Sequence, residues 1–171
     1  PNWASPTTSR RVAGTAVLPN EPIAITHWDS DDGLPPGPAA TIYQTRDGYL
    51  WFGMEEGLAR FDGVRSVIFD SRNVPELKVN LISALYEDQG GALWIGTLGG
   101  GLLRFQDDRM TAFGEEQGLM NLEINAITED QDGILWIGTD GGGLFRLAGN
   151  RFEKFVAEDG LVDLFVVSLS S

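Results

Sequence analysis

Short apolar runs alternate with polar turn residues along the whole chain. The runs "LWIGT" at 93–97 and 135–139 are apolar at successive positions, and "LWFGM" at 50–54 is a looser copy. Strands that are apolar on both faces must be covered on both sides. Because the runs are short and closely followed by glycines, the pattern predicts antiparallel β-sheet and argues against the long segments of a helical repeat.

Each copy divides into four such runs. In the third copy they lie at 124–130, 134–139, 143–147 and 151–155. The dipeptides between the first two runs are Asp47-Gly48, Gly90-Gly91 and Asp132-Gly133. These dipeptides favour tight hairpin turns with positive φ. Each copy is therefore predicted to be one four-stranded sheet.

Several residue types hold one period through the three copies. The markers recur at intervals of 42 to 44 residues: Trp51, Trp94 and Trp136; Gly48, Gly91 and Gly133; Arg60, Arg104 and Arg146. A period of roughly 40–45 residues is the length of one four-stranded propeller blade. Blades stacked around an axis cover both faces of each sheet, and the repeated tryptophan is expected to fill the gap to the next blade.

The fold class predicted is all-β: a partial β-propeller of three four-stranded antiparallel blades with one flanking strand at each end. Residues 1–22 are an N-terminal extension and 23–171 the partial propeller. Within it we expect an outer strand at 23–28 and an inner strand at 164–170. The blades are expected at about 39–69, 81–113 and 123–155. Val74-Pro75 stands where the other copies have Gly-Leu, so a different path is expected there.

The amino-acid composition argues against several classes of partner and chemistry. The net charge of −13 and a pI near 4.3 disfavour nucleic acid and anionic membrane surfaces as partners. The absence of cysteine excludes disulfides, thiolate catalysis and cysteine metal sites. No apolar run approaches the roughly 20 residues of a membrane helix. Since the chain does not begin with Met, we expect a mature or excised piece of a longer protein.

Two motifs suggest ligands and are better explained by structure. The glycine runs 99–101 and 141–143 lack the following helix and lysine that phosphate-binding loops use. The acidic stretch "EDQDG" at 129–133 lacks the ligand spacing of a calcium loop, so a structural aspartate turn is preferred over calcium. No metal site and no cofactor are predicted.

No catalytic residues are predicted. His27 is the only histidine, and a lone histidine without a paired nucleophile or metal is rarely catalytic. The arginines after "GL-x" recur once per copy, which favours a structural role with the stem on apolar surface and the head stacked on a tryptophan ring.

Positions at which the copies differ are better candidates for ligand contact. The loops that lead into each inner strand and those between second and third strands are expected on one concave face. That face would carry Glu55, Glu56, Asn121, Glu123 and Asp140. Its acidity favours a neutral or cationic ligand over an anionic one.

The segment "HWDSDDGLPPGPAATIYQTRDGYLWFGMEEGLARFDG" and the core "G-x-LWIGT-x-GGGL-x-R" resemble the two-component regulator propeller repeat, over about residues 25 to 168. The resemblance implies the periplasmic ligand-sensing region of a membrane-bound receptor, such as a hybrid histidine kinase or a diguanylate cyclase. The chain would be the N-terminal part of that region, without catalysis and without membrane contact of its own.

Two other functions stay open. The chain could be a protein–protein interaction or assembly module, or, less consistent with its single histidine, a propeller lyase. For a sensor the expected partner is an unidentified small molecule, with a carbohydrate as one option. Three blades do not close a ring of roughly 4–8 blades, so self-association through the open blade faces is also expected.

Overall fold

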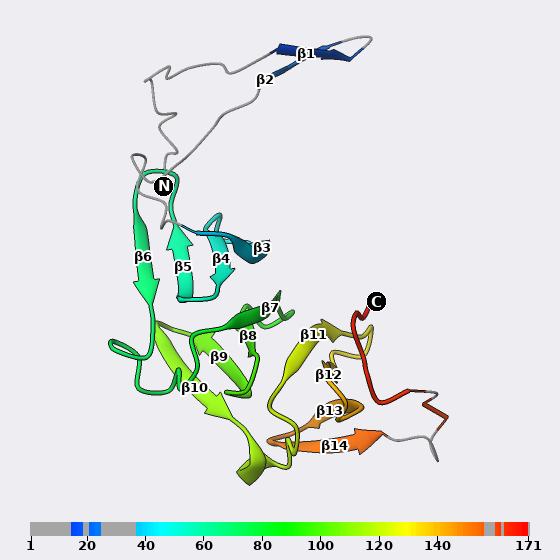
Figure 1. Ribbon diagram of the computed structural model, residues 1–171. Helices are drawn as coiled ribbons and strands as arrows, with labels where there is room; N and C mark the ends of the chain where they lie inside the picture. Colours follow the sequence, from blue (N-terminus) through cyan, green and yellow to red (C-terminus); the bar gives the residue numbers. More distant parts are fainter. Residues whose placement is uncertain (1–14, 19–20, 25–36, 156–159, 162, 171) are drawn as a thin grey trace.

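The computed structural model describes residues 15–18, 21–24, 37–155, 160–161 and 163–170, and these form antiparallel β-sheets with almost no helix (Figure 1). The first blade contains β3 (Ala39–Gln44), β4 (Leu50–Met54), β5 (Gly57–Phe61) and β6 (Ser66–Phe69). The second contains β7 (Ile82–Glu87), β8 (Leu93–Thr97), β9 (Leu102–Gln106) and β10 (Arg109–Phe113). The third contains β11 (Ile124–Glu129), β12 (Leu135–Thr139), β13 (Leu144–Ala148) and β14 (Arg151–Phe155). The predicted all-β fold with three four-stranded blades is confirmed.

The three blades fan out around their first strands. Strand β7 contacts both β3 and β11, whereas β6, β10 and β14 are the last strand of each sheet (Figure 1). The pairing of first and second strands shifts register near the start of β3, β7 and β11, so the same irregularity recurs in every blade. Repetition of this bulge indicates a built-in bend of each inner strand.

Apolar side chains between adjacent blades form the core. Trp51 of blade 1 is 2% exposed and clusters with Ile82, Leu93 and other residues of blade 2. Trp94 of blade 2 clusters in the same way with residues of blade 3, such as Ile124. Trp136 lies on the far side of blade 3, half-buried beside Phe155 at a ring-centroid distance of 5.2 Å. The expectation that the tryptophan fills the gap to the next blade therefore holds where a next blade is described.

The hairpin turns between first and second strands behave as the dipeptides predict. Gly48, Gly91 and Gly133 have φ values of 95°, 82° and 78°. A glycine adopts this left-handed conformation without the steric cost that a side chain would add. Each turn leads directly into the tryptophan-bearing strand, so the turn fixes where the indole ring lies.

Each tryptophan is also held by a hydrogen bond to its own hairpin. The indole Nε1 of Trp94 donates to Asp88 and that of Trp136 donates to Asp130, both at 2.7 Å. In blade 1, Thr45 replaces the aspartate and accepts from Trp51 at 3.1 Å. The acidic turn at 129–133 therefore has a structural role, because one of its carboxylates anchors the Trp136 side chain.

The ends of the chain differ from the expected flanking strands. Strand β2 (Glu21–Ala24) pairs with β1 (Thr15–Leu18) in a separate hairpin; it overlaps the expected outer strand only at 23–24, and residues 25–28 lie outside the described residues. Residues 164–170 run against blade 3, where Val166 donates its amide to the Thr139 carbonyl at 3.0 Å. They do not form the expected strand, and isolated backbone hydrogen bonds, such as that from the Gly143 amide to the Leu164 carbonyl at 2.8 Å, join them to blade 3.

The connection between blades 1 and 2 follows a different local path, as expected, and the spacing of the repeat resumes after it. Leu77 is 1% exposed and Leu119, in the next connection, is 0% exposed. The counterpart of Gly118-Leu119 is therefore Glu76-Leu77, two residues beyond Val74-Pro75. A turn in which Val74 donates its amide to the Asp70 carbonyl takes up the extra residues. In the connection between blades 2 and 3, the short 3₁₀ helix η2 (Glu115–Gln117) stands where this turn stands between blades 1 and 2.

Candidate functional site

Three of the five predicted ligand residues meet in one loop cluster on blade 3. The Asn121 side chain donates to the Asp140 carbonyl at 2.8 Å and accepts from the Glu123 amide at 2.8 Å. The Asp140 amide in turn donates to the Glu123 carbonyl at 2.9 Å. The carboxylates of Glu123 and Asp140 are exposed. The loop leading into β11 and the β12–β13 loop therefore share one face, as the sequence predicts.

Glu55 and Glu56 form the β4–β5 turn, on the corresponding loop of blade 1. Both are exposed, and no described contact joins them to the Asn121 cluster. Glu56 lies near Arg72: the Asp70 side chain is the main cause that raises the pKa of Arg72, and Glu56 adds a smaller Coulombic contribution. Ligand contact by these five residues stays a prediction.

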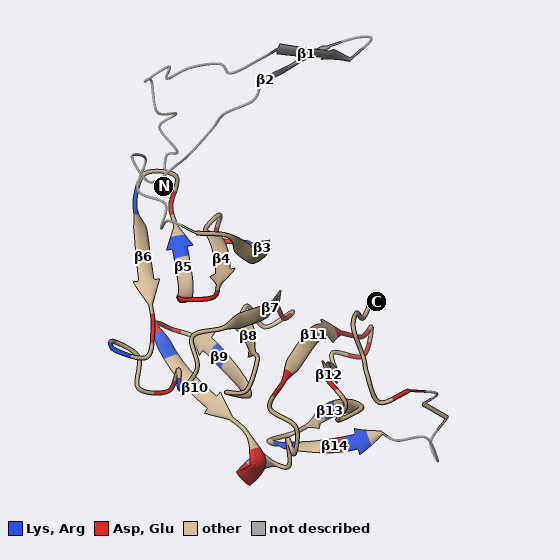
Figure 2. Cartoon of the chain, viewed as in Figure 1, with Lys and Arg blue, Asp and Glu red and all other residues tan. Residues whose placement is uncertain are grey.

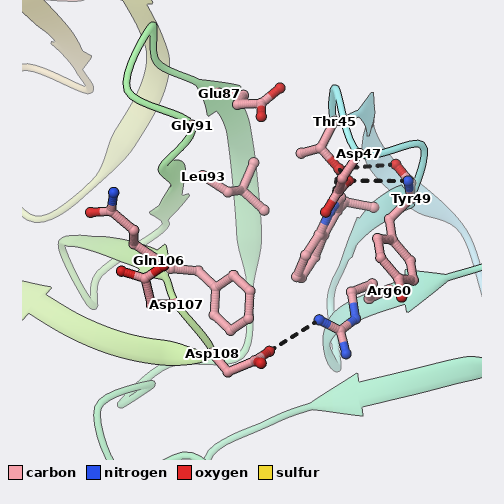
Figure 3. Close-up of a pocket in the computed structure, with 12 residues that line it drawn as sticks. Thr45, Asp47, Tyr49, Arg60, Glu87, Gly91, Leu93, Gln106, Asp107 and Asp108 are labelled. Carbon is pink, nitrogen blue, oxygen red and sulfur yellow. Dashed lines mark hydrogen bonds and ion pairs between the residues drawn. The ribbon is translucent and has the colours of Figure 1, made fainter. Parts of the chain in front are cut away.

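A cavity of about 350 Å³ opens between blades 1 and 2, at the end of the strands opposite to the loops that carry these predicted residues. The first blade contributes its β3–β4 hairpin, with Asp47 and Tyr49, and Arg60 of β5. The second contributes the end of β7 and the β9–β10 turn. Figure 3 shows these side chains on two sides of the opening, including Glu87, Gln106, Asp107 and Asp108 from blade 2. The lining thus combines charged, amide, hydroxyl and aromatic groups.

Arg60 is the cation of this cavity and is held by aromatic rings. Its guanidinium carbon lies 4.8 Å from the centre of the Tyr49 ring and 5.6 Å from that of Trp51. Two further rings, Phe69 and Phe105, lie within 5.9 Å. Its Nη1 is 3.5 Å from Asp108 Oδ1, an ion pair that crosses from blade 1 to blade 2 (Figure 3). With 22% of the side chain exposed, Arg60 forms part of the cavity wall.

The other repeated arginines make the same kind of stacking contact. Arg104 lies 5.8 Å from the ring centres of Trp94 and Phe113, and Arg146 lies 5.3 Å from that of Phe155. Figure 2 shows this positive charge on the strands β5, β9 and β13, among mostly uncharged positions. Such a contact in every blade is what a structural role would produce, but the ring beside Arg146 is Phe155 rather than the expected tryptophan. The Nε atoms of Arg60 and Arg104 are buried and have no hydrogen-bond partner in the described part of the chain.

At the same end of the strands as the cavity, glutamate carboxylates accept hydrogen bonds from the hairpin of the neighbouring blade. Glu129 Oε2 at the end of β11 accepts the amide of Gln89 in the blade 2 hairpin at 2.7 Å. Glu87 Oε2 at the end of β7 accepts the amide of Arg46 in the blade 1 hairpin at 2.9 Å. Both glutamates are 8% exposed, Glu87 by its side chain and Glu129 as a whole residue. These buried carboxylates are occupied by structural contacts, so they are poor candidates for ligand binding.

Asp130 is likewise committed to structure. The indole of Trp136 is the main cause that lowers the pKa of Asp130, followed by the Ile134 amide.

Among the described residues, no group of three or more histidine or acidic side chains is placed to hold a metal ion. His27 lies outside the described residues.

The cavity was missed in the sequence because its lining comes from two blades. A signal was nevertheless present in the copies. Asp107-Asp108 of the second copy stands where the third has Gly149-Asn150, and Tyr49 stands where the second has Ala92. Comparing the copies position by position across neighbouring blades would have identified these residues.

The sequence was compared with models of known families. The model described as "Two component regulator propeller" matches residues 33–56, 76–99 and 118–141, one segment for each blade. The chain belongs to the two-component regulator propeller family. The second segment begins at Glu76, in agreement with Leu77 as the counterpart of Leu119. A search of curated proteins finds no match.

Solved structures similar to this propeller chain include extracellular domains of hybrid two-component systems from B. thetaiotaomicron. The extracellular domain of BT3049 has a TM-score of 0.65 at 22% identity, over 86% of this chain and 20% of its own. That of BT4673 has a TM-score of 0.65 at 20% identity, over 85% and 22%. The chain thus spans about a fifth of the length of these solved extracellular domains, and the likeness shows the propeller fold.

A propeller enzyme also shares the fold. The virginiamycin B lyase from Staphylococcus aureus in complex with quinupristin has a TM-score of 0.51 at 16% identity, over 69% of this chain and 41% of its own. Such distant similarity carries no activity over to this chain.

Within the described residues, no helix has the length and apolar character needed to cross a bilayer.

Proposed function

We propose that this propeller chain is a non-catalytic, ligand-sensing part of an extracytoplasmic receptor of the two-component type. Family membership supplies the regulatory context, and the similar hybrid two-component structures are extracellular domains. The observation that carries the proposal is the cavity between blades 1 and 2, because it is a concave site where polar side chains from two blades converge beside aromatic rings. A periplasmic location follows from this context as part of the proposal.

A sensor binds its ligand without changing it, which fits the groups around the cavity. Among the described residues that line the cavity, none is histidine, lysine, cysteine or serine. Its hydroxyl groups are Thr45 and Tyr49, and the Thr45 hydroxyl already donates to Asp47 at 2.6 Å. The same oxygen accepts the Trp51 indole at 3.1 Å, so this hydroxyl is held by contacts within blade 1. Binding is therefore the activity that this site supports.

The proposal is tested by a thermal-shift screen of this chain against a library of small metabolites. A ligand present at 100 times its Kd stabilises the native state by roughly 2.7 kcal/mol. For a domain of this size that corresponds to a rise in Tm of about 5–10 °C. Recovery of the unchanged ligand by mass spectrometry would support a non-catalytic role. A library without stabilising compounds, or conversion of a bound compound, would contradict the proposal.

A second function, as an interaction module, is favoured by one observation. Ile42, Phe165 and Val167 are large apolar residues with exposed fractions of 60%, 62% and 76%. A contiguous apolar patch is typical of a protein-binding surface, and Phe165 and Val167 lie two residues apart on one segment. Capture of a defined protein partner that is abolished by Val167→Asp, with no small-molecule hit, would favour this function over sensing.

A further inference from the structure

Two of the carboxylates in the blade 1–2 cavity hold the hairpins in place. Asp47 Oδ1 accepts the Thr45 hydroxyl at 2.6 Å and the Tyr49 amide at 3.3 Å. Glu87 Oε2 accepts the Arg46 amide at 2.9 Å and lies 3.2 Å from the Nε of the same arginine. These contacts use one oxygen of each carboxylate, and Arg46 compensates the charge of Glu87.

The other two carboxylates, Asp107 and Asp108, form the β9–β10 turn and are accessible to a ligand. Both residues are exposed, and the Asp108 side chain is 88% exposed. Arg60 Nη1 lies 3.5 Å from Asp108 Oδ1, whereas no ion pair among the described residues includes Asp107. The lining as a whole carries four carboxylates against one guanidinium. This excess of negative charge attracts a cation and repels an anion.

The blade 2–3 junction shows which of these charges the packing of blades requires. The charged residues that hold neighbouring blades and stack on the rings recur there, as Glu129 and Arg104. The carboxylates of the β9–β10 turn do not recur, because the strand registers place at their positions Gly149 and Asn150. Asp107 and Asp108 are therefore additional to the groups that hold two blades together.

A second, more apolar cavity of about 180 Å³ adjoins the first and extends it. The two cavities have Phe105 and Asp108 in common. The apolar part of the second lining also includes Phe69, Val74, Pro75 and Met110. A ligand whose charged group lies at Asp108 can therefore place an apolar group against these side chains and remove apolar surface from water.

We infer that the two cavities form one site for a small organic cation that carries an apolar group. Asp107 and Asp108 bind the cationic group, and the side chains of Phe69, Phe105 and Met110 pack against the apolar one. Figure 3 shows the two aspartates at the side of the first cavity that blade 2 contributes. This inference rests on the proposed sensing function and gives that function a ligand class.

The test compares four small probes that separate charge from apolar surface. Phenethylamine, phenethyl alcohol and hydrocinnamate have the same ring and the same two-carbon chain, and they end in an ammonium, a hydroxyl and a carboxylate group. Methylammonium has the charge without the ring. Binding of each probe to the full chain is measured by calorimetry. We expect phenethylamine to bind at least tenfold more tightly than each of the other three.

The variant Asp107→Asn/Asp108→Asn removes the charge and keeps the shape of the turn. The two residues have φ values of 53° and 56°, a conformation that asparagine tolerates, so the variant is expected to fold. Its affinity for phenethylamine should fall at least tenfold, to the level of phenethyl alcohol, and its affinity for the alcohol should not change. The control Glu115→Gln/Glu116→Gln removes two charges from η2, which lines neither cavity, and should bind like the wild type.

The methionine methyl groups locate the bound probe. Met110 lines the second cavity, whereas Met54 and Met120 line neither. The ring of phenethylamine is expected to shift the Met110 methyl resonance in the carbon–proton spectrum and to leave those of Met54 and Met120 unmoved.

Three results would overturn the site or its ligand class and leave sensing intact. They are equal phenethylamine affinity of the aspartate variant and the wild type, a shift at Met120 in place of Met110, and preference for the alcohol or for hydrocinnamate. If none of the four probes binds but the metabolite screen yields a ligand, only this inference fails. If the screen also yields none, the proposed function fails as well.

Discussion

Ile124 of β11 packs directly on Gly96 of β8, with its Cγ2 only 2.6 Å from the position that a Cβ on Gly96 would occupy. The same approach occurs between Ile82 and Gly53, at 2.6 Å, and between Val166 and Gly138, at 2.6 Å. Each glycine belongs to the second strand of one blade, and each branched residue belongs to the segment that begins the next. The glycine of "LWIG" is therefore what allows neighbouring blades to approach closely.

Substitution of Gly96 by alanine should destabilise the chain. The new methyl group would lie 2.6 Å from Ile124 Cγ2 and 3.2 Å from the Ala84 Cβ, so blades 2 and 3 must separate. Overpacking of this kind costs about 1–3 kcal/mol. Urea denaturation followed by tryptophan fluorescence should show a lower midpoint for Gly96→Ala.

Gly114→Ala is the matched control. Gly114 has a φ of −161°, which any residue can adopt, and its added Cβ would meet Leu122 at an ordinary 3.6 Å. We expect its midpoint to stay close to that of the wild type. Equal stability of the two variants would show that the approach of Ile124 to Gly96 does not limit the packing of the blades.

Much of the fold could be predicted because each blade uses the same local solution. The tryptophans, hairpin glycines and stacked arginines recur in the sequence since every blade must fill the same gap and make the same turn. The interruption of the repeat at Val74-Pro75 correctly predicted a different path, but not that two additional residues there still bring Leu77 to the core. It also expected a strand at 164–170, where pairing requires a partner strand that the described residues do not supply.

The site could be predicted only in part. Asn121, Glu123 and Asp140 meet as expected, because the loops of one blade follow from its strand order. Tyr49 and Asp108, in contrast, are brought to one cavity by the packing of blade 1 on blade 2. A period read along one chain fixes positions within a blade, and it does not by itself show which side chains of two blades face each other.

Removal of the Glu129 carboxylate should loosen the contact between blades 2 and 3. Its Oε2 accepts the Gln89 amide at 2.7 Å in a buried setting. Hydrogen bonds to charged groups contribute about 1.5–3 kcal/mol, so Glu129→Ala should lose stability in that range. Glu129→Gln keeps an acceptor oxygen and should lose less. The amide of Gln89 is the local reporter, and its hydrogen exchange should accelerate in Glu129→Ala.

Glu76→Ala serves as the comparison, because Glu76 is exposed in the connection between blades 1 and 2. Its stability and its Gln89 exchange should match the wild type. Unchanged Gln89 exchange in Glu129→Ala would mean that this hydrogen bond does not hold the two hairpins together.

The hydrogen bond from Trp136 to Asp130 predicts a dependence of stability on pH. This bond, with the amide of Ile134, lowers the pKa of Asp130 below its ordinary value of 3.8. A lowered folded-state pKa means that the carboxylate stabilises the native state above about pH 3.8, and that this contribution is lost as the pH falls through the lower folded value. Asp130→Ala should therefore be less stable than the wild type at pH 6, and the difference should shrink towards pH 2.5.

Denaturation of both proteins at several pH values checks this expectation, with Asp132→Ala as the control. Asp132 lies in the same hairpin and is exposed, and its amide rather than its carboxylate contacts Asp130. A gap between wild type and Asp130→Ala that stays constant from pH 6 to pH 2.5 would show that the charge of Asp130 contributes nothing to the native state.

The apolar residues beside blades 1 and 3 predict self-association. Ile42 on β3 is 60% exposed, and Phe165 and Val167 beside blade 3 are 62% and 76% exposed. Within the described chain neither side is covered by a further blade, and pairing of such surfaces removes apolar area from water. Sedimentation velocity should show a concentration-dependent dimer or larger species. Phe165→Asp/Val167→Asp should shift it to monomer, whereas Val64→Asp, on an exposed residue of the β5–β6 loop, should not. A monomer at all concentrations would contradict association through these faces.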